Sequence, residues 1–152
     1  MHLLIPLHLL AVLIWVGGMF FAYVVLRPSA AATLEPPLRL TLWAGSFKRF
    51  FPWVWASIIV LLVSGLMLIF NYLGGFAGVP AYVHIMFTLG LIMMAIFMHV
   101  FFAPYRRLRA AVDARDWETA GKNLNQIRRM VGINLLLGLI TTIIASAGRY
   151  LA

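Results

Sequence analysis

The chain has 152 residues, of which 64% are hydrophobic and only 11% are charged. A soluble domain is closer to half apolar and a quarter charged, so this composition excludes an ordinary water-soluble fold and predicts a membrane protein. The absence of cysteine excludes disulfides, thiolate chemistry and cysteine-ligated zinc or iron–sulfur sites. The net charge of +8 does not indicate nucleic-acid binding, because the basic residues lie between apolar segments, as they do in cytoplasmic loops of membrane proteins.

Four apolar segments are long enough to cross a bilayer as helices, which takes about 20 residues. They run over residues 3–26, 50–73, 79–103 and 130–148. The third and fourth continue as polar helical segments, which gives expected helices over about 79–112 and 116–150. We therefore expect a single all-α integral membrane domain over residues 1–152, an up-down bundle of four transmembrane helices.

The two longer connections carry further local signals. Apolar, aromatic and basic side chains alternate after Pro36-Pro37, which predicts an interfacial helix over about 37–49, and Pro52 is expected to kink or restart the chain before the second span. In the later connection Pro104 is a candidate bend. Asp116 is a candidate cap for the last helix.

The distribution of basic residues predicts the orientation of the bundle. The loop over residues 74–78 carries no charge, and Arg149 is the exception near the chain end. By the positive-inside rule both termini face the periplasm or exterior, and the longer connections face the cytoplasm, as expected in a bacterial inner membrane. Eleven of the twelve Lys and Arg residues lie in these two connections: Arg27, Arg39, Lys48, Arg49, Arg106, Arg107, Arg109, Arg115, Lys122, Arg128 and Arg129.

Two histidines are the strongest candidates for a cofactor site. In this topology His8 and His84 lie at depths that differ by only about 3 Å, on helices that face each other diagonally across the bundle. Two neutral imidazoles, without cysteine or an intramembrane carboxylate, suit a six-coordinate haem iron, whereas they leave copper under-coordinated. Arg149 lies near the same end of the bundle and is suited to bind a haem propionate.

Other interpretations of these residues stay open. His8 and His84 are equally typical of interfacial side chains that hydrogen-bond water or lipid head groups. Trp15 follows His8 by two helical turns, so it either lines a cofactor pocket or packs against other helices. His99 lies roughly 22 Å further along its helix than His84, which excludes a metal shared with His8. The roles of His99 and His2 are left open.

The first span resembles a known family. It reads His8-Leu-Leu-Ala-Val-Leu-Ile-Trp15-Val-Gly17-Gly18, with Arg27-Pro28 after it, and this pattern resembles the opening helix of the CopD family of copper-resistance membrane proteins. Arg49-Phe50-Phe51 and Ser64-Gly65 are similar to that family's next helix. The histidine-then-tryptophan opening is also similar to the HemJ-type protoporphyrinogen oxidases, and that resemblance implies a b-type haem with His8 as a ligand.

These observations favour a membrane-embedded haem b protein that carries electrons near the periplasmic face, with His8 and His84 as axial ligands and Trp15 and Arg149 nearby. The alternatives are a CopD-type copper-handling protein, in which His2, His8, His84 and Met86 pass the ion inward, and a HemJ-like oxidoreductase acting on a porphyrin or quinone. An accessory subunit without a cofactor is a further alternative. The expected partners are the lipid bilayer, an unidentified redox partner or quinone and, as a possible homodimer, a second copy of the chain.

Overall fold

The computed structural model describes residues 2–151, without the side chains of Arg149 and Leu151. The described chain is helical apart from short turns, and it contains no strand. Four of its helical segments are long and apolar enough to cross a membrane: Leu4–Thr33, Pro36–Tyr72, Ala81–Asp113 and Trp117–Gly148. The prediction of an all-α fold with four transmembrane helices is therefore confirmed.

The first span continues beyond its expected end at Leu26. It consists of α1 (Leu4–Phe20), a π-helical stretch η1 (Phe21–Leu26) and α2 (Arg27–Thr33). Pro28 has no N–H to donate to the carbonyl four residues earlier, and its fixed φ angle suits the start of a helix. The wider π turns just before it accommodate the lost hydrogen bond without ending the helix.

The second span differs from the expected arrangement of an interfacial helix followed by a break. α3 runs without interruption from Pro36 to Tyr72, with Pro52 inside it. Trp43, Phe47 and Phe51 are buried and follow one another at intervals of about one helical turn, so they lie on one face of α3. Val54 is also buried and continues this face beyond the proline. Because this packing face crosses Pro52 unbroken, tertiary contacts hold the helix together where the local sequence favours a restart.

The third span bends where Pro104 was expected to bend it. α4 (Ala81–Phe102) and α5 (Pro104–Asp113) are separated by Ala103, whose φ of −114° and ψ of −88° are not helical. The last helix, α6 (Trp117–Leu151), begins directly after Asp116, whose carboxylate accepts a hydrogen bond of 3.2 Å from the Thr119 backbone N–H. This contact is a side-chain N-cap, as the sequence predicts.

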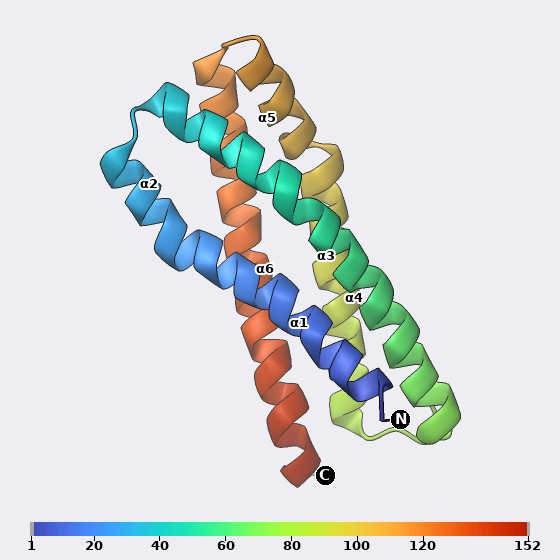
Figure 1. The fold of residues 1–152 in the computed structure, drawn as a ribbon. Helices are drawn as coiled ribbons and strands as arrows, with labels where there is room; N and C mark the ends of the chain where they lie inside the picture. The colour runs from blue at the N-terminus through green and yellow to red at the C-terminus, as the bar shows by residue number, and fades with distance from the viewer. Residues whose placement is uncertain (1, 152) are drawn as a thin grey trace.

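The four spans form a bundle with chemically different ends. Figure 1 shows the chain termini and the α3–α4 turn at one end, and the α2–α3 turn and α5–α6 hairpin at the other. α1 packs mainly on α3, while α4 and α5 pack on α6. The long connections, with their basic residues, therefore share one end, which we call the basic end. We call the opposite end the terminal end.

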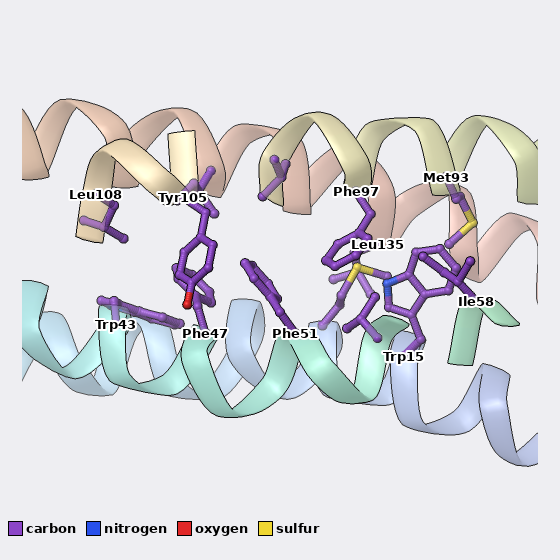
Figure 2. Packing of buried hydrophobic residues seen from close by; sticks show 14 of the residues in the cluster. Trp15, Trp43, Phe47, Phe51, Ile58, Met93, Phe97, Tyr105, Leu108 and Leu135 are labelled. Atoms are coloured by element: carbon purple, nitrogen blue, oxygen red, sulfur yellow. The ribbon is translucent and has the colours of Figure 1, made fainter. Parts of the chain in front are cut away.

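An aromatic cluster fills the middle of the bundle and its basic half (Figure 2). Phe51 stacks on Phe47 with ring centroids 5.0 Å apart and meets the edge of Phe97 at 5.2 Å. Trp15 adds an edge contact to Phe97 at 6.3 Å. Outside this core many large apolar side chains are exposed, among them Leu13, which is 70% exposed, and such a surface is suited to lipid.

The α6 cap gives a first testable prediction. Asp116→Ala removes the acceptor for the Thr119 N–H, so we expect the melting temperature in detergent to fall by about 2–4 °C. Asp116→Asn keeps an acceptor and should stay near the parent value. Hydrogen bonds from the Thr119 side chain and backbone lower the pKa of the Asp116 carboxyl. The stabilisation by the charged cap is therefore present at neutral pH and is lost as the pH falls through that lowered pKa.

Candidate functional site

A cavity of about 310 Å³ lies in the terminal half of the bundle, where α1, α3, α4 and α6 meet. This volume is at the lower end of the range for small-ligand sites, and the lining is mainly apolar, as in most such sites. Among the described residues, His8 is the one histidine that lines it. The other lining residues include Trp15, Met86, Gly90, Met93, Met94 and Gly138.

The tautomer of the His8 imidazole can be inferred from its hydrogen bond to Ser64 of α3. Its Nδ1 lies 2.8 Å from Ser64 Oγ, and the Ser64 hydroxyl donates its single proton to the backbone carbonyl of Val60, one turn earlier on α3. Ser64 Oγ can then only accept, so His8 Nδ1 carries the proton and donates it. This leaves the lone pair on Nε2, the nitrogen that a metal ion would bind.

The contact between His8 and Ser64 is well protected from solvent within the bundle. Ser64 is 2% exposed and His8 is half-buried. A second partner that orients a metal-binding imidazole through its other nitrogen is typical of metal sites in proteins. The position of Ser64 on α3 thus gives the His8 side chain the arrangement expected of a ligand.

Trp15 and the small residues around the cavity set its shape. Trp15 is 3% exposed and lines the cavity on the side of the aromatic cluster, through its edge contact with Phe97. At Gly138 on α6, an added Cβ atom would lie 2.9 Å from Val16 of α1 and 3.1 Å from the Met93 methyl group. A side chain at this position would push the helices apart, so Gly138 permits their close approach.

The structure does not bring His84 to this cavity. His84 is exposed and does not line the cavity, and its ring lies 6.1 Å from that of Phe76 in the α3–α4 turn. α4 contributes Val83, Met86 and Phe87 to the cavity lining, among others, but not His84. The depth of His84 follows from its position in the span, but depth does not determine the face.

The remaining candidates lie elsewhere. His2 and His99 are exposed, and neither lines the cavity. The Arg149 side chain lies outside the described residues, so the expected contact with a propionate stays a prediction. The described part of the chain contains no group of three or more His, Cys, Asp or Glu side chains that could hold a metal ion. A metal in this cavity would therefore need further ligands in addition to His8.

Methionine thioethers are the other side-chain donors in this cavity with the chemistry to bind a soft metal ion. Met86, Met93 and Met94 line the cavity together with His8, and Met93 and Met94 are buried. Their thioether sulfurs are soft donors, which select copper(I) over harder ions. The sequence analysis named Met86 in the copper alternative but did not identify Met93 and Met94 as candidate ligands. Met93 and Met94 follow Met86 by seven and eight residues, which is about two helical turns. This spacing could have indicated that the three methionines lie on similar faces of the helix.

These observations describe a four-helix membrane protein with an apolar cavity that offers one oriented imidazole and several thioethers. Residues 44–147 match the family model of copper resistance protein D (CopD), which covers more than half of the chain. The chain therefore belongs to the CopD family. No match was found among curated proteins or among solved structures.

The family match bears on the sequence-based hypotheses unequally. The resemblance to the CopD family is confirmed, although the matched range begins after the His8–Trp15 motif that suggested it. The match fits the copper alternative. It gives no support to haem b or electron transfer, and it does not show the relation to HemJ-type oxidases.

The His8–Ser64 contact generates a second prediction. Ser64→Ala removes the acceptor that fixes the His8 tautomer, so we expect the affinity of the purified protein for copper(I) to fall by about 10–100-fold. Ser57 is also buried on α3 and does not line the cavity, so Ser57→Ala is the matched control and should change the affinity little. Competition with a chromogenic copper(I) chelator measures both. Equal losses in the two variants would contradict the assigned role of Ser64.

Proposed function

We propose that this protein binds copper(I) as cargo in the terminal-end cavity, with His8 Nε2 and methionine thioethers as ligands. The observation that carries the proposal is the cavity shared by the oriented imidazole and Met86, Met93 and Met94 in a chain of the CopD family. A histidine nitrogen and soft sulfur donors form a ligand set that suits copper(I).

The electrostatics of the cavity favour the singly charged ion. The cavity lining contains no Asp, Glu, Lys or Arg side chain, so only neutral ligands are available among the residues that form it. The cost of moving an ion from water into an apolar environment rises steeply with its charge, and a divalent ion here would lack a compensating carboxylate. Copper(I) is thus a better occupant than copper(II) or zinc.

The aromatic cluster separates this cavity from the basic end. Trp15, Phe97 and Phe51 contact one another in sequence along the bundle axis (Figure 2). Next to Trp15 is a void of only about 30 Å³, which Asn134 also lines, and this is large enough for a water molecule. Because these rings pack against one another between the two ends, binding and transfer of copper at the terminal end fit the structure better than an open channel.

The proposal includes the orientation inferred from charge, with both termini and the cavity on the periplasmic side of a bacterial inner membrane. The absence of cysteine makes this a clean test. Ala77→Cys lies in the α3–α4 turn and Ala114→Cys in the α5–α6 hairpin, and both positions are exposed. We expect a membrane-impermeant maleimide to label the first in intact cells and the second only after permeabilisation. The reverse pattern would contradict the orientation.

A haem b protein is the second candidate function. The same observation favours it, because an oriented imidazole in a mainly apolar cavity would also suit haem iron. With His84 outside the cavity, His8 and a methionine among Met86, Met93 and Met94 would hold the haem. A bound haem would supply one-electron redox chemistry, as an electron carrier or in an oxidoreductase acting on a quinone or porphyrin. The residues themselves would only hold and orient it.

Metal analysis and the visible spectrum of the purified protein separate the two functions. We expect a colourless protein that binds about one copper(I) ion per chain, as a single soft-donor site implies. His8→Ala should weaken copper binding at least about tenfold, because it removes the nitrogen ligand. His84→Ala is the control and should leave binding within about twofold.

A red protein with a sharp Soret band that depends on His8 would instead support the haem candidate. Copper binding that is lost in His84→Ala and kept in His8→Ala would contradict the assignment of His8 as the metal ligand.

A further inference from the structure

The basic end contains a second cavity, of about 440 Å³, which the proposed copper site does not use. It lies between the π-helical turn η1, α2, the first turns of α3 and the first half of α6. α2 and the first turns of α3 and α6 lie at the basic end in Figure 1. Three arginines line the cavity, Arg27 from α2, Arg39 from α3 and Arg128 from α6. Three separate helices thus contribute one guanidinium group each.

These arginines have no carboxylate partner within the described chain. Its one ion pair joins Lys122 to Glu118, on the exposed surface of α6. The residues that line the cavity include no Asp or Glu. Arg27 instead lies over the Tyr23 ring, 4.5 Å from its centroid. Like charges gathered in a concave site repel one another, so an anion between them would relieve that repulsion.

The wall of the cavity has an apolar part as well. Arg27 and Arg39 are half-buried, and Leu40, Trp43 and Phe47 line the side toward the middle of the bundle. A guanidinium group is planar and forms paired hydrogen bonds with phosphate oxygens. Arginines above an aromatic and aliphatic wall therefore match a ligand that has a phosphate group and a hydrocarbon portion.

We propose that this cavity binds a phosphate group, with the head group of an anionic phospholipid as its source. Basic pockets between transmembrane helices on the cytoplasmic side are suited to anionic head groups, and the chain places its basic connections around this one. The three arginines bind the phosphate, and the apolar wall contacts the first part of the acyl chains. The proposal does not depend on the terminal-end cavity or on its cargo.

The test is a titration of the full chain in uncharged detergent with dioctanoyl phosphatidylglycerol, followed by tryptophan fluorescence. Trp43 and Trp117 both line the cavity, so binding should change the signal. Dioctanoyl phosphatidylcholine should bind at least about tenfold more weakly, because its head group has no net charge. Inorganic phosphate is titrated separately. If phosphate alone saturates the site as tightly as the lipid, the phosphate chemistry is supported and the source is a soluble anion.

Charge-removing variants locate the site. The affinity for phosphatidylglycerol should fall about fivefold for each of Arg27→Gln, Arg39→Gln and Arg128→Gln, and about a hundredfold when all three are combined. The matched control removes three exposed charges elsewhere in the basic connections, in Lys48→Gln, Arg106→Gln and Arg129→Gln. It should lower the affinity by less than about fivefold.

Two results would overturn the proposal: equal binding of the two lipids, or equal losses in the pocket variant and its control. Arg128 is exposed, so Arg128→Gln alone decides the question if the triple variant does not fold. Copper binding, measured in the same samples, should be unchanged by the pocket substitutions. If copper binding were lost while lipid binding stayed intact, the result would count against the proposed copper site and not against the phosphate site.

Discussion

The hydrogen bond between His8 Nδ1 and Ser64 Oγ joins α1 to α3 beside a mainly apolar cavity that His8 lines. In the low-dielectric interior of a membrane bundle, a polar side chain without a partner is costly, so the His8 ring is stabilised by this partner. The Ser64 hydroxyl is already committed to the Val60 carbonyl, and this fixes which imidazole nitrogen carries the proton. The chemistry proposed for the cavity depends on the lone pair that this arrangement leaves on Nε2.

Much of the fold could be predicted from the sequence because the bilayer imposes simple rules. Span length and the grouping of basic residues identified four helices and the shared end of the two long connections, and Asp116 identified the start of α6. The continuity of α3 could not be predicted, since Pro52 favours a break locally. Only the packing of Phe51 and its neighbours across that proline shows why the helix continues.

The candidate site could be predicted only in part, for a geometric reason. Hydropathy gives the depth of a residue in the membrane but not the direction in which its side chain points. His8 and His84 were expected at one depth, yet His8 lines the terminal-end cavity and His84 does not, while α4 contributes methionines to the lining. The contact between Ser64 and His8 could not be predicted from the sequence either, because the two residues lie 56 positions apart in the chain. The bundle therefore places soft donors at the terminal end and arginines at the basic end, with aromatic rings between them.

X-ray absorption spectroscopy at the copper edge of the copper(I)-loaded protein tests the central claim most directly. It reports the elements bound to the metal, and the proposed site requires one imidazole nitrogen together with thioether sulfur. In His8→Ala the nitrogen contribution should disappear while sulfur remains. A parent spectrum with only nitrogen and oxygen neighbours, or one unchanged by His8→Ala, would contradict the assignment of His8 and the cavity methionines as copper ligands.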